Sequence, residues 1–386
     1  MRPRNQVLLL LACIGLAACA FMGFVSEAPN RLTSGQPLML WQTVSPPVFA
    51  GLYMLGLLLF IASFVTPTRA IHWVTLLAAC ALLFLLLHGA GAAAAALALS
   101  AKPAARTLLG AAFWVSGLCS ALAMIDAVQR LRLGPAVKLL LAGALAVLIF
   151  MLLASGDLDH LSVAREYQAR RGVFAAELLV HVELVLGAFV PAVLIGIPLG
   201  MLALRKPKFQ GTVFGTLNLL QTIPSVALFG LLIAPLAALA TALPALDAIG
   251  LHGIGAAPAI IALTLYSLLP LARNAYAGIA GVETGIVEAA QGMGFSPRQI
   301  FWRVELPLGL PVFLAGARIA LVQLIGLAVI AALIGAGGLG SFIFQGIGQY
   351  AVDLVLLGTI PVILMALAAD FLLQILIALT RGKSPA

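Results

Sequence analysis

Long apolar stretches alternate with short polar segments along nearly the whole chain. A helix needs about 20 mostly apolar residues to cross the hydrocarbon core of a bilayer. About ten stretches of the sequence meet this requirement, and the short connections between them favour helices that cross the membrane in alternating directions. The predicted spans are 7–25, 47–66, 71–89, 108–126, 136–155, 180–204, 213–236, 256–276, 313–335 and 355–378.

The composition agrees with a membrane protein. Of the 386 residues, 63% are hydrophobic and only 9% are charged, and the mean hydropathy is +1.16. A soluble domain is usually about 45–50% apolar and about 25% charged. A soluble fold would lack the polar surface to cover this apolar content. We therefore predict an all-α polytopic membrane protein that has the lipid bilayer as its solvent.

The net charge of +8 is explained by topology. If the N-terminus is cytoplasmic, fifteen of the 21 Lys and Arg residues fall in cytoplasmic segments, and the opposite orientation would invert this ratio. Cytoplasmic loops of membrane proteins carry an excess of Lys and Arg. The pattern therefore predicts a multi-pass protein with both termini in the cytoplasm, and we expect no nucleic-acid partner.

Cysteine and histidine residues give no sign of a metal or catalytic site. The four cysteines lie in apolar stretches without metal-ligand spacing, and the five histidines are scattered, so we predict neither metal nor catalysis. Leu16 to Cys19 resembles the end of a lipoprotein signal with its lipidated cysteine. A first span that contains a cysteine is the alternative we favour, because nine further spans follow and cleavage would upset the charge distribution.

The chain divides into two blocks. Residues 1–155 hold about five Ala- and Leu-rich spans, residues 156–179 form a predicted periplasmic loop, and residues 180–380 form a core with more Gly and Pro. Broken helices are tolerated in membranes where protein or a cavity satisfies the freed backbone groups, which favours a solute pathway in the core. Ordinary transmembrane helices with proline are the alternative. The prolines are Pro191, Pro198, Pro224, Pro270 and Pro361.

The longest predicted cytoplasmic loop, 278–311, has the pattern of two short amphipathic helices. Apolar residues recur at helical spacing from Glu283 to Gly294, where glycine can adopt the left-handed conformation that ends a helix. Ser296 and the Pro-Arg-Gln that follows it are typical of a helix start, and Pro307 should end the second helix. Such a pair could lie on the lipid surface or dock into another protein.

The spacing within this loop resembles the EAA loop of ABC importer permeases. The matching residues are Glu288, Ala289, Ala290, Gly294, Leu306 and Pro307, with Val304 where the family often has isoleucine. In that family the loop is a coupling helix that sits in a cleft of a separate ATPase subunit. The resemblance implies that this chain is a transport subunit and no enzyme, that it holds no cofactor, and that ATP and Mg²⁺ bind on the partner ATPase.

A wider resemblance covers most of 175–380 and narrows the family. It rests on His181 to Met201, Gln221 to Ser225, Leu268 to Asn274 and Ile334 to Gly340, which resemble permeases for glycine betaine, choline and related osmoprotectants. Ala28 to Leu32 and Asp159 to Tyr167 further resemble the YehY type of that family, whose N-terminal extension precedes a five-span, methionine-permease-like core (type I ABC importer). This implies a bacterial inner-membrane protein with a second permease chain and a periplasmic substrate-binding protein as partners.

Other motifs are weaker. Gly335 to Gly340 fits G-x-G-x-x-G, but it ends a membrane span and does not link a strand to a helix, so we expect no dinucleotide there. We expect a pathway or gating role for Pro224, Arg273 and Asp370. For Asp370, the clearest intramembrane acid, a hydrogen bond to a neighbouring helix is the alternative. Arg273 and Arg318 lie at the inner ends of the spans on either side of loop 278–311, and we expect them to act primarily as anchors at the membrane interface.

Two other classes of function remain as alternatives. An ion- or proton-coupled secondary transporter would be active without any ATPase and would give loop 278–311 no role. A membrane enzyme would need a catalytic constellation, which the sequence does not show.

Overall fold

The computed structural model describes residues 3–30, 33, 35–100, 104–243, 245 and 252–380. The chain forms two compact units, which we treat separately. Unit 1 comprises Met1–Ala169 together with Gln349–Asp353, and unit 2 comprises Arg170–Gly348 and Leu354–Ala386.

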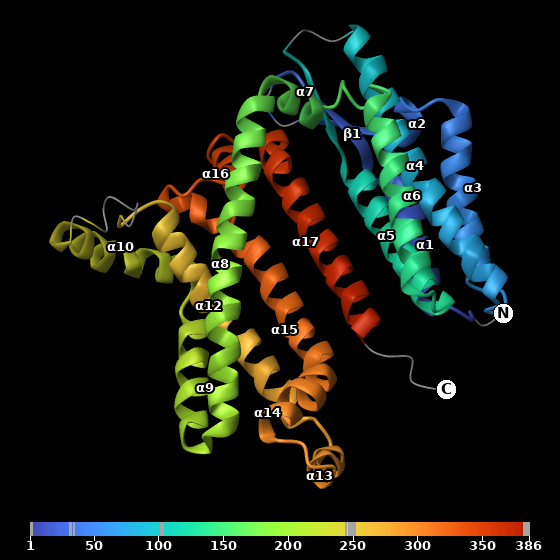
Figure 1. The fold of residues 1–386 in the computed structure, drawn as a ribbon. Coiled ribbons are helices and arrows are strands. Elements are labelled where there is room, and N and C mark those ends of the chain that lie inside the picture. Colours follow the sequence, from blue (N-terminus) through green and yellow to red (C-terminus); the bar gives the residue numbers. More distant parts are fainter. Residues whose placement is uncertain are drawn as a thin grey trace. The chain divides into compact units, whose positions relative to one another are not determined.

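Unit 1 is a helical bundle with a small sheet, drawn in blue to green in Figure 1. Apolar faces of α1, α3, α4 and α5 bury a common core that includes Leu52, Leu86 and Phe113. Asn5 caps α1, and its side chain also donates to Asp126 at 2.8 Å, which fixes the start of α1 against α5. Its helices are α1 (Gln6–Phe21), α2 (Leu40–Thr43), α3 (Pro46–Ala62), α4 (Arg69–Ser100), α5 (Ala111–Leu131), α6 (Pro135–Ala154) and α7 (Ser162–Ala169).

An antiparallel sheet of three short strands joins these helices and was not expected from the sequence. Its order is β2 (Gln36–Met39), β1 (Gly23–Ala28) and β3 (Arg106–Leu109). Each strand has at most six residues and directly precedes or follows an apolar helix. A hydropathy pattern therefore merges the strands with the helices, whereas the pairing that defines them joins segments far apart in the chain, such as Val25 and Leu109.

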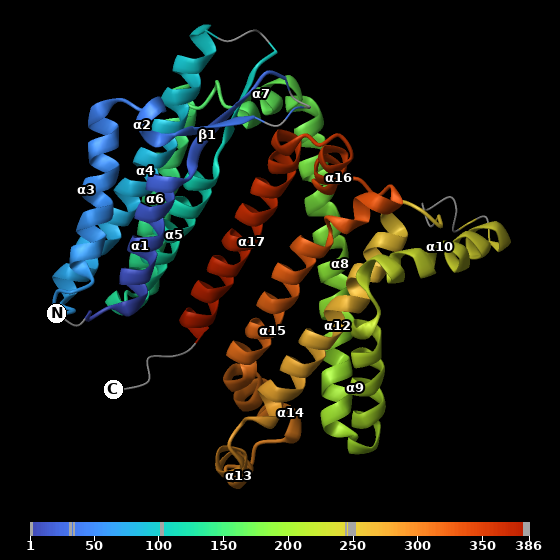
Figure 2. The ribbon, with the colours of Figure 1, turned by 180° about the vertical axis from the view of Figure 1, so that it is seen from behind.

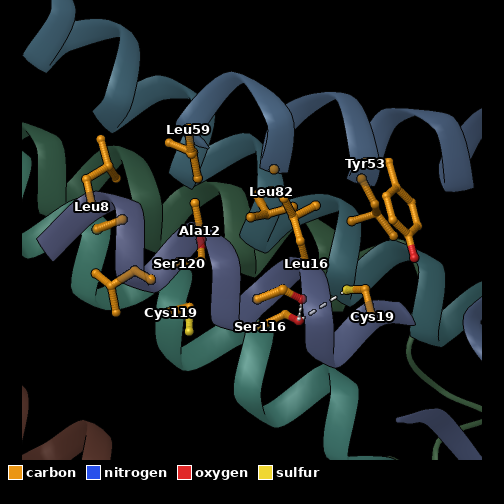
Figure 3. Close-up of a pocket in the computed structure, with 15 residues that line it drawn as sticks. Leu8, Ala12, Leu16, Cys19, Tyr53, Leu59, Leu82, Ser116, Cys119 and Ser120 are labelled. Carbon is orange, nitrogen blue, oxygen red and sulfur yellow. Dashed lines mark hydrogen bonds between the residues drawn. The ribbon is translucent and has the colours of Figure 1, made fainter. Parts of the chain in front are cut away.

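The core of unit 1 contains a small apolar pocket, seen in Figure 3. Cys19 and Ser116 meet at one side of the pocket, with their Sγ and Oγ atoms 3.2 Å apart, and Tyr53 lies near Cys19. The cavity measures about 20 Å³, which is room for about one water molecule. It is therefore too small to hold an organic solute.

Unit 2 is built around α8, α12 and α15, which pack side by side (Figures 1 and 2). Helix α9 runs back along α8, and α10 leaves α9 at a large angle. Its elements are α8 (Arg171–Arg205), α9 (Pro207–Thr222), α10 (Ser225–Ala242), α12 (Ala256–Ala280), α13 (Thr284–Gly292), α14 (Pro297–Ile300), the π-helical turn η1 (Phe301–Glu305), α15 (Leu306–Leu327), the 3₁₀ turn η2 (Ile330–Ile334), α16 (Gly340–Gly348) and α17 (Val352–Thr380).

Glycines allow the three central helices of unit 2 to approach closely. A Cβ atom at Gly200 on α8 would lie 2.3 Å from the carbonyl oxygen of Ala272 on α12. Gly278 on α12 and Gly309 on α15 face each other, and a Cβ atom at Gly309 would lie 2.7 Å from the Gly278 carbonyl oxygen. Small residues at such crossings permit backbone contact between membrane helices. The three helices therefore form a tight framework.

Among the described residues, eight helices are long and apolar enough to cross a membrane, and α1 and α3 are shorter apolar helices of 16 and 17 residues. The predicted span 213–236 was wrong as a single helix. The chain breaks at Ile223 and Pro224, because Pro224 disfavours helical geometry at the residue before it. The last part of the predicted span 313–335 is a 3₁₀ turn that follows the end of α15 at Leu327.

The predicted loop 156–179 contains regular structure as well. It holds α7 and the first residues of α8, which begins at Arg171. The apolar pattern starts later than the helix because the first turns of α8 carry polar residues such as Glu177.

Candidate coupling segment and pathway residues

The helix α13 ends in a Schellman motif at Gly294, the residue that the sequence predicted to end the helix in a left-handed conformation. Gly294 has a φ of 81°, in the left-handed region. The Phe295 N–H donates to the Ala290 carbonyl at 3.1 Å, and the Gly294 N–H donates to the Gln291 carbonyl at 2.9 Å. These two bonds satisfy carbonyl groups that a helix end otherwise leaves unpaired. The turn after α13 therefore has a defined geometry.

The second helix of the loop starts with the predicted capping box. The Gln299 side chain accepts from the Ser296 N–H at 2.8 Å, and the Gln299 N–H donates to the Ser296 hydroxyl at 3.4 Å. Pro297 occupies the first turn, where its missing N–H costs no hydrogen bond. The chain direction between α13 and α14 is thus fixed by residues within the segment itself.

The prediction that Pro307 ends this helix was wrong. Helical geometry continues from α14 through η1 into α15, and Leu306 has helical dihedral angles of −64° and −47°. The Leu306 N–H donates to the carbonyl of Phe301, five residues earlier. Such a π turn widens the helix locally. We infer that this widening accommodates the ring of Pro307, which lies in the first turn of α15.

We name residues 284–305, which comprise α13, α14 and η1, the coupling segment. It lies at one end of unit 2, and η2 and α16 lie at the opposite end (Figures 1 and 2). Ala290 is buried, whereas Glu288 and Ala289 are exposed. The large apolar side chains of Ile286 and Met293 are 42% and 69% exposed. The segment therefore leaves large parts of these apolar and acidic side chains exposed.

An open pocket with a volume of about 770 Å³ adjoins these helices. It is lined by residues of α13, α14 and η1 and by Arg205 at the end of α8. The Arg205 guanidinium lies 5.4 Å from the centre of the Phe301 ring, in cation–π geometry. Trp302 also lines this pocket and is 58% exposed. Exposed aromatic and arginine side chains of this kind are enriched where proteins bind each other.

The coupling segment is continuous with the framework of unit 2. Leu306 and Phe301 pack against a buried cluster formed by Ala275, Ile279 and Phe313 on α12 and α15. Pro307 is exposed. A force applied to the segment would therefore reach α12 and α15 through Leu306 and Phe301.

The three predicted pathway residues lie in different parts of unit 2. Pro224 stands at the break between α9 and α10, where the Tyr266 hydroxyl donates to the Ile223 carbonyl. Arg273 on α12 is exposed and donates to the Asn218 side chain of α9 at 2.8 Å. Asp370 on α17 pairs with Arg318 on α15. The structure thus places the first two along the α9–α12 contact, and the third elsewhere.

Two residues of α8 were missed by the sequence analysis. Glu177 accepts a hydrogen bond from the Gly338 N–H at 2.5 Å, and His181 is fully buried against the last turn of α15. Glu177 precedes the apolar stretch from which the span was recognised, and a single histidine carries no spacing signal. Their partners lie more than 140 residues away in the chain. In the described part of the chain, no three His, Cys, Asp or Glu side chains gather as metal ligands.

Each half of the chain matches a known protein family. Residues 3–164 match the family described as "ABC transporter permease YehY, N-terminal domain". Residues 192–382 match the family described as "Binding-protein-dependent transport system inner membrane component". Among solved structures, the inward-facing MetNI methionine ABC transporter is similar, with a TM-score of 0.47 and 24% identity over 54% of this chain and 95% of that chain.

Curated relatives match about half of this chain over most of their own length. The choline transport system permease protein OpuBB of Bacillus subtilis is 38% identical over 50% of this chain and 82% of its own length. The osmoprotectant import permease protein OsmW of Salmonella typhimurium is 40% identical over 53% of this chain and 89% of its own length. The chain thus belongs to the family of permease subunits of binding-protein-dependent ABC importers.

Proposed function

We propose that this permease carries glycine betaine, choline or a related osmoprotectant into the bacterial cytoplasm. The support is chemical similarity among the named solutes of its relatives: choline, carnitine and glycine betaine are all quaternary ammonium compounds. These relatives are 37–40% identical to this chain over about half of its length. The coupling segment lies within residues 192–382, which match the family of the inner membrane component.

The coupling segment docks, in this proposal, into a cleft of a separate ABC ATPase subunit. One observation carries this step: an internally fixed helix pair exposes Ile286 and Met293 beside the charged Glu288. A lipid-surface helix would also expose apolar groups, but it would not need a defined turn between two short helices. Two permease chains would pair around the pathway and two ATPase subunits would bind ATP and Mg²⁺. A periplasmic binding protein would deliver the solute.

Closure of the ATPase pair would then move the coupling segment and, through Leu306 and Phe301, the framework of α12 and α15. Pro224, Arg273 and Asp370 are the residues that we assign to the pathway or its gates. Pro224 marks a helix break, which often borders a solute site in transporters. Asp370 is an ionisable group within a span, and such groups are costly unless they serve a function or have a partner.

Solute selectivity should lie mainly in the binding protein. A quaternary ammonium group is usually held by a cage of aromatic rings. Tyr266 is buried with its hydroxyl bonded to the backbone, and Tyr276 packs edge-on against Phe214 with ring centres 5.6 Å apart. Neither arrangement is a cage. A binding protein of different specificity but the same docking surface should therefore change the imported solute, and unchanged preference would place selection within this chain.

The central test is uptake into vesicles that contain the purified chain. Radiolabelled glycine betaine should enter only when the ATPase, ATP and the binding protein are all present. A preparation without ATP, and one with a non-hydrolysable ATP analogue, are the controls. Uptake by the chain alone, driven by a proton or sodium gradient, would contradict the proposal and support a secondary transporter.

A further inference from the structure

The helix that follows the coupling segment ends in an unusual break. After α15, the turn η2 leads into residues 335–340, which we name the glycine loop, and α16 begins at its last residue. Gly335, Gly337 and Gly338 have φ values of 77°, 77° and 85°. Side chains disfavour this left-handed region, so glycine permits a chain path here that other residues would strain. The loop therefore joins α15 and α16 through a segment that can rearrange at low cost.

Two side chains of α8, one helical turn apart, hold both sides of this break. The Glu177 carboxylate accepts from the Gly338 N–H at 2.5 Å and lies 3.4 Å from the Ser341 hydroxyl. The His181 Nε2 atom lies 3.1 Å from the carbonyl oxygen of Ile325 in the last turn of α15. A carbonyl oxygen only accepts hydrogen bonds, so Nε2 must carry the proton. We name these contacts of Glu177 and His181 the latch.

The latch is closely packed. His181 is fully buried, and its Nδ1 atom has no hydrogen-bond partner among the described residues. A Cβ atom at Gly338 would lie 3.2 Å from this nitrogen, and one at Gly337 would lie 3.2 Å from the Glu177 carboxylate. Both glycines thus face α8 closely. A buried polar atom without a partner costs free energy, which makes the closed latch less stable than a fully satisfied contact.

The latch is also mechanically connected to the coupling segment. Helical structure runs without a break over the 31 residues from Pro297 to Leu327. At 1.5 Å per residue this is a rod of about 45 Å. The rod carries the coupling segment at one end and Ile325 near the other. Because α8 is a separate helix, any sliding or tilting of α15 against it changes the distances within the latch.

We propose that Glu177 and His181 are positioning residues of the transport cycle. They hold the end of α15 and the glycine loop against α8 while that end of the pathway is closed, and they release both when it opens. The contacts suit this role because they consist of a few hydrogen bonds, two to backbone atoms and one to the Ser341 hydroxyl, which form or break together with the movement of one helix end. The proposal rests on the proposed docking of the coupling segment into the ATPase.

Substitution of Glu177 tests the holding role in the complete transporter. Glu177→Ala removes the acceptor for the Gly338 N–H, and the number of ATP molecules hydrolysed per solute imported should rise about tenfold or more. Glu177→Gln has the same size and keeps an acceptor oxygen, so it should restore much of the coupling. Bonds to a charged acceptor are stronger, which leaves the Gln variant intermediate. An unchanged ratio in a stably inserted Glu177→Ala chain would overturn the proposal.

A reversible cross-link tests the release. Arg170 at the start of α8 is half-buried and donates to the side chain of the exposed Gln345 on α16 at 3.2 Å, so cysteines at these two positions tie α8 to α16 outside the latch. The four native cysteines, Cys13, Cys19, Cys80 and Cys119, would first be replaced by alanine. Joining the new pair with a short, reducible bifunctional reagent should lower uptake at least about tenfold, and reduction should restore it.

The outcomes separate this inference from the function on which it rests. Full uptake by the joined protein would show that the latch stays closed throughout the cycle, and this would overturn the proposal even if the Glu177 variants fail to insert. Loss of uptake with the ATPase still bound and hydrolysing ATP is the expected result. Failure of the unsubstituted chain to co-purify with the ATPase would instead contradict the coupling role.

Discussion

Arg318 on α15 and Asp370 on α17 form an ion pair, with the Arg318 Nε atom 2.5 Å from the Asp370 Oδ1 atom. The second Asp370 oxygen accepts from the Gln374 side chain at 2.6 Å. The pair is partly exposed, at 36% and 30% of the two side chains. Charges within a bilayer face protein or water and have partners. The pair therefore marks a surface of unit 2 that lipid alone would cover poorly.

Removal of both partners should harm the protein less than the sum of the two single removals. Asp370→Ala leaves Arg318 unpaired within the membrane, and Arg318→Ala leaves the carboxylate unpaired. We expect each single variant to reach the membrane in lower amount and to melt at lower temperature. The double variant should be less damaged than the sum predicts, with a coupling free energy of about 1 kcal/mol, because partial exposure weakens the pair.

The measurement is a double-mutant cycle on thermal unfolding in detergent, together with initial uptake rates. Asp370→Asn is the matched control, since it keeps the size and one acceptor oxygen but removes the charge. Strictly additive losses would mean that the two residues act independently. Normal stability with lost uptake in Asp370→Asn would favour the pathway role over a purely structural one.

Local sequence was sufficient to predict the turn and the second helix start within the coupling segment. Gly294 and Ser296 determine the turn and the second helix start through hydrogen bonds within about five residues, so their spacing carries the geometry. The continuation through Pro307 could not be predicted in this way. Proline normally disfavours helical geometry at the preceding residue. Here Pro307 nevertheless lies within a continuous helix, directly after a π turn in which the Leu306 N–H donates to the Phe301 carbonyl.

Contacts between distant segments were out of reach of the sequence pattern. The sheet of unit 1 pairs Val25 with Leu109, and the latch pairs Glu177 with Gly338. Neither pairing changes the local hydropathy that identified the spans. The break at Pro224 was visible as a proline, but the flanking residues are apolar enough for both arms to be read as one span.

A chain that starts at residue 172 should insert and bind the ATPase, because the coupling segment and its framework lie entirely in unit 2. It should nevertheless be less stable than the full chain. Residues 349–353 belong to unit 1, where Asp353 is 2% exposed and accepts from the Ser162 hydroxyl at 2.6 Å. Truncation removes this partner and uncovers the segment.

Thermal unfolding and co-purification with the tagged ATPase check this prediction. Ser162→Ala in the full chain is the control, since it removes the same hydrogen bond but keeps the rest of unit 1. It should lower stability by about 1 kcal/mol or more because the acceptor is buried. A truncated chain that inserts but never binds the ATPase would mean that the N-terminal residues are part of the coupling machinery.

The distribution of Lys and Arg predicts which side of the membrane each loop faces. A cysteine in place of His160, which is exposed between α6 and α7, should react with a membrane-impermeant thiol reagent added outside the cell. A cysteine in place of Ser384, which lies outside the described residues, should react only after the membrane is opened. Both variants need the native cysteines replaced. The reverse labelling would place the coupling segment outside the cell, away from any ATPase.

Gly294 offers the most direct test of docking. Its φ of 81° disfavours other residues, but a Cβ atom there would meet no neighbour within 4 Å, so the chain itself has space for a larger side chain. Asparagine tolerates left-handed geometry best after glycine, so Gly294→Asn should cost about 1 kcal/mol. Gly294→Asp has nearly the same shape and adds a charge, which an ATPase cleft would bury at a cost of several kcal/mol.

The difference in ATPase binding between Gly294→Asn and Gly294→Asp therefore reports on contact with the ATPase and not on the stability of the chain's own fold. Affinity for the ATPase should fall about a hundredfold or more in Gly294→Asp, and uptake should fall to background, while Gly294→Asn retains most of both. Glu288→Ala should be mild because the helix survives and only polar contacts of an exposed side chain are lost. Uptake and co-purification of the ATPase are measured for all three at equal amounts in the membrane. If Gly294→Asp inserts normally and transports at the full rate, the residue does not lie in a protein interface, and the coupling assignment fails.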